Sequence, residues 1–104
     1  MRGVADDQWI GSRDNAIIGQ LDITAAELTE LGGLIQRVPD QLGEVELAVF
    51  VLGSGDVVSL SRAEGSPVGG YTLICASPDG ARVLDQFLRE AGLGRNRLTI
   101  SLLD

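Results

Sequence analysis

Hydrophobic and polar positions alternate along five stretches of the chain, a pattern typical of strands that bury one face. These stretches are residues 16–23, 45–52, 56–62, 71–76 and 97–103. Stretches 45–52 and 71–76 become apolar on both faces, which favours central positions in a sheet. In stretch 16–23, Ile17, Leu21 and Ile23 are predicted to share the buried face. The segment Gly53-Ser54-Gly55-Asp56, which leads from stretch 45–52 into stretch 56–62, is typical of a hairpin turn.

A helical period follows the first of these strands. Thr24 and Glu27 have the spacing of a capping box, and Ile23 and Leu28 that of a hydrophobic staple. The period predicts a helix that ends before Pro39, with a buried face formed by Leu28, Leu31, Ile35 and Val38. Gly32-Gly33 leaves two interpretations open: a point of close approach to the sheet, or an early end to the helix.

A second helix is predicted between the fourth and fifth strands. Ser77 is suited to its N-cap and Pro78 to its first turn, while Gly92 is suited to its C-terminal cap. Leu84, Phe87, Leu88 and Ala91 share one face of this segment, which we expect to be buried.

These elements predict an α+β protein with the order β-α-β-β-β-α-β. The economical arrangement is a mostly antiparallel five-stranded sheet with both helices on one face. Residues 1–15 lack periodicity and are predicted to be a mobile N-terminal arm, followed by a single α+β domain at 16–104. The outer sheet face would carry small polar side chains, either solvated or paired: Gln20, Asp22, Ser59, Ser61, Thr99 and Ser101.

Composition excludes most enzyme chemistry. The chain has no histidine, no lysine and a single cysteine, Cys75, so imidazole bases, Schiff-base lysines and the usual zinc ligand sets are missing. Glu44 and Glu46 fit an ordinary solvated strand edge better than a catalytic pair of carboxylates. The Gly53–Asp56 turn has too few oxygen ligands to bind calcium. The loop Gly65–Gly70 lacks the lysine of a phosphate-binding loop. We therefore expect no catalytic residues, no cofactor and no metal.

Charge and cysteine content indicate the type of partner and the cellular compartment. The 15 acidic and 8 basic residues give a formal net charge of −7, which disfavours nucleic acid and anionic membranes and favours basic protein partners. A lone cysteine suits a reducing compartment, and no secretory signal or membrane span is evident, so a cytoplasmic location is expected. Basic residues that are all arginine indicate a GC-rich, bacterial codon usage.

Three functions remain open. The favoured one is a small, acidic, non-catalytic protein-interaction module: an accessory subunit, an adaptor, a secretion-chaperone-like protein or an immunity-type protein. The alternatives are a small-ligand binding or sensory domain, with a pocket at Leu31, Ile35, Leu73 and Phe87, and a carboxylate-based enzyme. A terminal edge strand at 97–103 could also pair with a second copy of the chain. The partner contacts that we predict are Trp9, Ile10, Glu64, Val68, Arg95 and Arg97.

Overall fold

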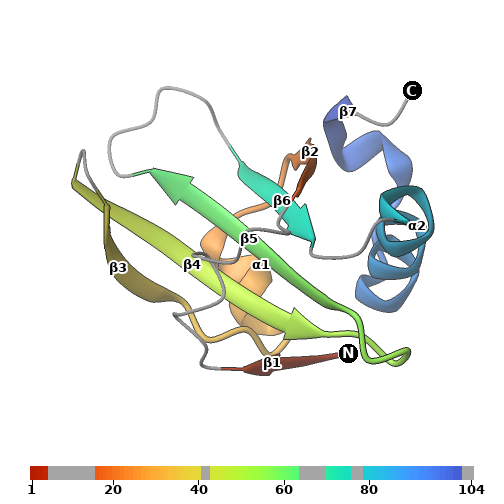
Figure 1. Cartoon of the computed structure of the whole chain (residues 1–104), viewed down its shortest axis with the longest axis horizontal. Helices are drawn as coiled ribbons and strands as arrows, with labels where there is room; N and C mark the ends of the chain where they lie inside the picture. The colour runs from red at the N-terminus through yellow and green to blue at the C-terminus, as the bar shows by residue number, and fades with distance from the viewer. Residues whose placement is uncertain (5–15, 41–42, 64–69, 76–78, 102–104) are drawn as a thin grey trace.

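The computed structural model describes residues 1–4, 16–40, 43–63, 70–75 and 79–101. Two helices and a short 3-10 turn, η2, are set among the strands of an antiparallel sheet (Figure 1). In chain order the elements are β1 (Arg2–Val4), β2 (Ala16–Leu21), α1 (Ala25–Glu30), β3 (Gln36–Asp40), β4 (Gly43–Val51), β5 (Val57–Ala63), β6 (Tyr71–Cys75), α2 (Gly80–Ala91), η2 (Arg95–Arg97) and β7 (Leu98–Ser101).

The sheet has seven strands in the order β1-β4-β5-β6-β2-β7, and β3 also pairs with β4. Strand β4 is nine residues long, and one of its edges pairs with β5. Its other edge is divided, because residues 43–47 pair with β3 and residues 49–51 pair with β1. The α+β class and the antiparallel sheet are confirmed. The prediction of five strands and their order was wrong, since β1 and β3 were not foreseen.

Strand β1 lies inside the segment 1–15 that was predicted to be an arm, and it has only three residues, too few for a periodic signal. Residues 5–15 are outside the described part of the chain, so the rest of that prediction stays a prediction.

The first helix is much shorter than its period suggests. Its capping box is confirmed: the Glu27 amide donates to Thr24 Oγ1 at 3.2 Å and the Thr24 amide donates to Glu27 Oε1 at 3.2 Å. The helix ends at Glu30, and Gly32 adopts a φ of +90° that reverses the chain. A Cβ at Gly33 would lie 2.8 Å from Leu28 O and from Phe50 Cζ. The glycine pair therefore both ends the helix and permits close packing, which frees residues 36–40 to form β3.

The second helix spans twelve residues and ends as predicted. Gly92 takes the left-handed conformation, with φ 71° and ψ 27°, and the Leu93 amide donates to Leu88 O at 2.8 Å. Its start differs from the prediction, since Asp79 is the N-cap residue. The predicted cap, Ser77-Pro78, lies outside the described residues.

A bulge in β2 changes which of its side chains are buried. Ile17 pairs with Ile74 and Gly19 with Leu73, so Ile18 is the extra residue between them. One extra residue reverses the alternation of faces upstream of it. Ile18 consequently occupies the core position, at 1% exposure, while Ile17 lies on the opposite face at 54%. The prediction that Ile17 shares the buried face with Leu21 was wrong for this reason.

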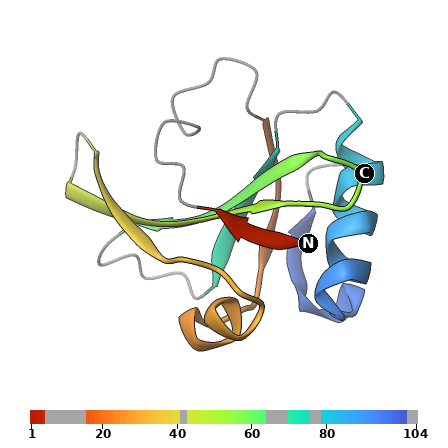
Figure 2. The same ribbon diagram turned by 90° about the horizontal axis from the view of Figure 1, so that it is seen from below.

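Both helices contribute to one core on a single face of the sheet. Figure 2 shows α1 beneath the sheet and α2 beside it. The α2 residues are Val83, Leu84, Phe87 and Leu88, and α1 contributes Leu28. They pack with strand residues of alternating positions: Ile18, Leu21, Ala48, Phe50, Val58, Leu60, Tyr71, Leu73 and Cys75. The Phe50 and Phe87 rings lie 6.2 Å apart, in a tilted arrangement.

The two outer edges of the sheet are poorly suited to recruiting another strand. At one edge, β1 has three residues and β3 carries Pro39, which has no amide hydrogen to donate. At the other, β7 has four residues and its register shifts against β2 between Gln20 and Leu21. Short strands, bulges and edge prolines are the usual protection of a sheet against further pairing.

Substitution of Gly70 tests the close approach between β6 and β2. Gly70 and Gly55 both have positive φ, +85° and +91°, but only Gly70 is crowded, because a Cβ there would lie 2.0 Å from Leu21 O. Gly55→Ala should cost about 1–2 kcal/mol of unfolding free energy from backbone strain. Gly70→Ala should cost about 1–3 kcal/mol more, because overpacking adds to the same strain. Urea denaturation of both variants measures the difference, and equal losses would contradict the packing seen at Gly70.

Candidate functional site

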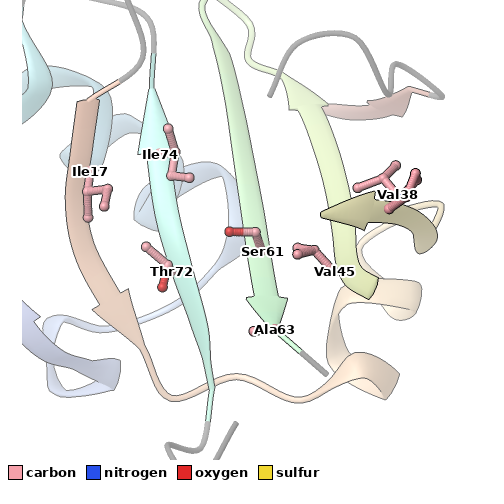
Figure 3. A pocket seen from close by; sticks show the side chains of 8 residues that line it. Ile17, Val38, Val45, Ser61, Ala63, Thr72 and Ile74 are labelled. Carbon is pink, nitrogen blue, oxygen red and sulfur yellow. The ribbon is translucent and has the colours of Figure 1, made fainter. Parts of the chain in front are cut away.

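The sheet face opposite the helices carries the candidate site. Val38, Val45, Leu47 and Val49 form a second apolar cluster there, with Val4 and Val57 packed against it. Beside this cluster lies a hollow of about 420 Å³, viewed in Figure 3. It is lined by Ile17, Val38, Pro39, Val45, Ser61, Ala63, Thr72 and Ile74. We call this hollow the sheet-face trough.

The trough has a floor of small side chains between walls of branched aliphatic ones. Ser61 and Ala63 of β5 and Thr72 of β6 form the floor (Figure 3). One wall is made by Ile17 and Ile74, which pair across β2 and β6. The facing wall is made by Val38 and Val45, which pair across β3 and β4. None of the lining residues carries a charge, so apolar contact is the chemistry that the walls offer.

Ile17 is the most unusual residue of this site. It is exposed over 54% of its surface and lies in the trough because of the bulge at Ile18. Bulges frequently re-aim a side chain at a functional surface. Ile17 was not predicted as a site residue, although the sequence holds a signal: a glycine inside a strand pattern, here Gly19, is a common mark of a bulge.

Among the described residues, two buried polar atoms on this face have no hydrogen-bond partner. Ser59 is fully buried, and its Oγ has no hydrogen-bond partner among the residues that the structure describes. Gln36 Nε2 is also buried without a partner there, and Gln36 lies opposite Leu47 in the β3–β4 pair. By contrast, Thr72 Oγ1 donates to Gln20 Oε1 at 2.8 Å. The small polar face predicted from the sequence thus exists at Gln20, Ser59 and Ser61, but Ser59 is not solvated.

Removing the Ser59 hydroxyl should not weaken the fold. A buried donor without a partner costs free energy, so Ser59→Ala should leave the unfolding free energy unchanged or raise it by about 1 kcal/mol. Thr72→Val, which removes a hydroxyl that is hydrogen-bonded, should lower it by about 1 kcal/mol. Thermal or urea unfolding of the two variants gives the comparison. A clear loss in Ser59→Ala would mean that its hydroxyl has a partner.

In the described part of the chain, Tyr71, on the helix-covered face, has a strongly perturbed pKa. Its ring is buried, and its hydroxyl donates to Glu46 Oε2 at 2.7 Å. Burial, and secondly the hydrogen bond to Glu46, raise the pKa of Tyr71 to about 12. A phenol with so high a pKa stays protonated near neutral pH and is a poor proton donor, so the observed hydrogen bond to Glu46 acts as a contact within the fold.

The raised pKa of Tyr71 predicts a loss of stability in alkali. Between pH 10 and about 12 the unfolded state releases the Tyr71 proton while the folded state keeps it, so the unfolding free energy falls as pH rises through this window. The loss should be on the order of 2 kcal/mol. No lysine titrates in the window, and Tyr71 is the single tyrosine, so phenolate absorbance follows this group alone.

Urea midpoints at pH 9 to 12 test this expectation, with Tyr71→Phe as the control. The variant should have a lower stability at pH 9, because Glu46 loses a donor, but a flatter dependence on pH above 10. An equally steep decline in Tyr71→Phe would show that another group causes it.

The structure places two of the predicted partner contacts in internal ion pairs. Arg97 Nη2 donates to both carboxylate oxygens of Glu27, at 2.7 and 2.6 Å, and its Nε donates to Asp22 O at 2.7 Å. This arrangement joins η2 to α1, and hydrogen bonding to Arg97 lowers the pKa of Glu27. Arg95 is exposed and pairs with Asp85. Trp9, Ile10, Glu64 and Val68 lie outside the described residues, so their roles stay predictions.

Other reactive groups do not converge on a site in the described part of the chain. Cys75 is a buried thiol in β6. No group of three or more acidic or cysteine residues is placed to hold a metal ion, within the ranges that the structure describes. The pocket predicted between helices and sheet is not where the trough lies, because Leu73 and Phe87 are fully buried in the core. Neither described helix is long and apolar enough to cross a membrane.

Comparison with known proteins adds no relative. No protein-family model, no curated protein and no solved structure matches this chain.

Proposed function

We propose that this protein is a non-catalytic protein-interaction module whose binding surface is the sheet-face trough. The observation that carries the proposal is the exposed Ile17, which a strand bulge places in an aliphatic wall of that trough. An exposed aliphatic side chain at an uncharged hollow supports an interaction surface.

The described acid–base groups favour binding over catalysis. The carboxylates of Glu27 and Asp56 have pKa values lowered by hydrogen bonds, from Arg97 to Glu27 and from Ser54 to Asp56. Hydrogen bonding that involves the N-terminal amine similarly lowers the pKa of Glu90. A carboxyl group that acts as a general acid needs its pKa raised instead. These three carboxylates are therefore suited to hydrogen bonds and ion pairs within the fold rather than to general acid catalysis.

The face is a better binding surface than the edges. The edge strands are short, and they carry a proline in β3 and a register shift at β7, features that oppose addition of a strand from a second copy. The trough presents side chains instead of backbone groups, so a partner can bind there without strand pairing. We therefore favour a different protein over a homodimer formed through a sheet edge.

Co-purification of variants from native expression levels tests the surface. Leu34 is a matched control for Ile17, because it is an aliphatic residue with 53% exposure outside the trough lining. Ile17→Glu should lose a stoichiometric partner detected by mass spectrometry, because the charge would be buried at the interface. Leu34→Glu should retain it. Both variants should unfold within about 0.5 kcal/mol of the wild type, since exposed positions tolerate substitution.

Three outcomes are decisive. Retention of the partner by Ile17→Glu would move the binding surface away from the trough. Loss in both variants would point to a general effect of added negative charge. A protein without any partner, but stabilised by small molecules, would favour the ligand-binding alternative, for which the volume of about 420 Å³ is adequate.

A further inference from the structure

We propose that β1 is a strap that opens while the core stays folded, and that Glu90 of α2 holds this strap closed. The strap lies at one edge of the sheet, with its N-terminal end toward α2, and it is independent of the binding surface proposed above (Figure 2). Three observations carry the proposal: the contacts of the Glu90 carboxylate, the small share of β1 in the two apolar clusters, and the close fit of Gly3.

The Glu90 carboxylate joins α2 to two other parts of the chain. The Met1 amine, next to β1, forms an ion pair with Glu90 Oε1 at 3.0 Å. The Gly53 amide, in the turn after β4, donates to both carboxylate oxygens, at 3.0 and 3.2 Å. Within α2, Gln86 Nε2 donates to Glu90 Oε2 at 2.7 Å. Since neither Gly53 nor Gln86 belongs to β1, these two bonds keep the carboxylate in position when the strap opens.

The core does not depend on β1. Among the described residues, neither apolar cluster has a buried member from this strand: Met1 packs against the margin of the helix-side cluster, and Val4 packs against the other. When β1 leaves residues 49–51, β4 keeps its pairing with β5 along the other edge. A short segment with so few buried apolar contacts is typical of a unit that opens locally.

Gly3 gives a second way to open the strap, at a distance from Glu90. It pairs with Phe50, and a Cβ on it would lie 2.2 Å from Gly32 O and 2.9 Å from Gly33 Cα. Both clashes are with backbone atoms, which cannot rotate away as the end of a side chain does. A methyl group at this position should therefore displace β1 from β4.

Native-state hydrogen exchange of the full chain, followed by NMR, tests whether the strap opens by itself. The hydrogen-bonded amides between β1 and β4 should exchange faster than those between β5 and β6. Added urea should accelerate exchange in the β5–β6 pair and leave the β1–β4 pair almost unaffected, because a local opening exposes little new surface. Equal rates with equal urea dependence in the two pairs would overturn the strap.

Glu90→Gln tests the role of the carboxylate, because it keeps the shape of the side chain and removes its charge. It should accelerate exchange of the β1–β4 amides about tenfold, through loss of a hydrogen bond between charged groups. Asp85→Asn is the matched control, since it lies on the same helix and loses an ion pair with Arg95 instead. It should leave these amides as they are in the wild type. Unchanged exchange in Glu90→Gln, or equal acceleration in Asp85→Asn, would overturn the role of Glu90.

A double-mutant cycle, measured as urea midpoints, shows whether Glu90 and Gly3 act on the same strap. Gly3→Ala should lower the midpoint by releasing β1. Glu90→Gln should then lower it further by less than it does in the wild type, because the Met1 contact is already lost. Asp85→Asn should have the same effect with and without Gly3→Ala. If the effects of Glu90→Gln and Gly3→Ala simply add, Glu90 does not act through β1 and the proposal is wrong.

Discussion

The pairing of β4 on both of its edges is the constraint on which the fold depends. This strand is long enough to bind β5 on one side and two separate strands, β3 and β1, on the other. Its alternate residues belong to two apolar clusters: Ala48 and Phe50 face the helices, and Leu47 and Val49 belong to the cluster on the opposite face of the sheet. A strand with one polar face could not support both clusters, so the continuous apolar run of β4 gives the sheet two apolar faces.

Local signals in the sequence were sufficient for much of the fold. The capping box of Thr24, the cap at Gly92 and the strands β4, β5 and β6 were predicted because each depends on neighbours within a few residues. Strands β1 and β3 depend instead on the distant edge of β4. Val38 fits a helical period and a strand period equally well, and only the turn at Gly32 decides between them.

The candidate site was harder to predict than the fold, because it depends on a bulge in β2 that moves Ile17 from one face of the sheet to the other. The alternation of residues 16–23 is correct for Leu21 and Ile23, yet one extra residue at Ile18 transfers Ile17 to the other side of the sheet. Such a reversal is set by pairing with β6, which no pattern within a single strand records. The arginines illustrate a different limit. The sequence does not show that the Arg97 guanidinium hydrogen-bonds to Glu27 and to the Asp22 carbonyl, and its role as a partner contact stays a prediction.

The divided edge of β4 also affects how the protein resists aggregation. β1 covers only Val49 to Val51, and its Gly3 lies so close to the Gly32–Gly33 turn that a Cβ there would meet Gly32 O at 2.2 Å. Only a glycine fits this contact, so the cover of that part of β4 depends on a small patch of backbone packing. If β1 detaches, an apolar stretch of backbone with high strand propensity becomes available to other molecules while the remaining sheet is still formed. Detachment of this short strand, which requires no unfolding of the core, is therefore the step that would expose this edge of β4.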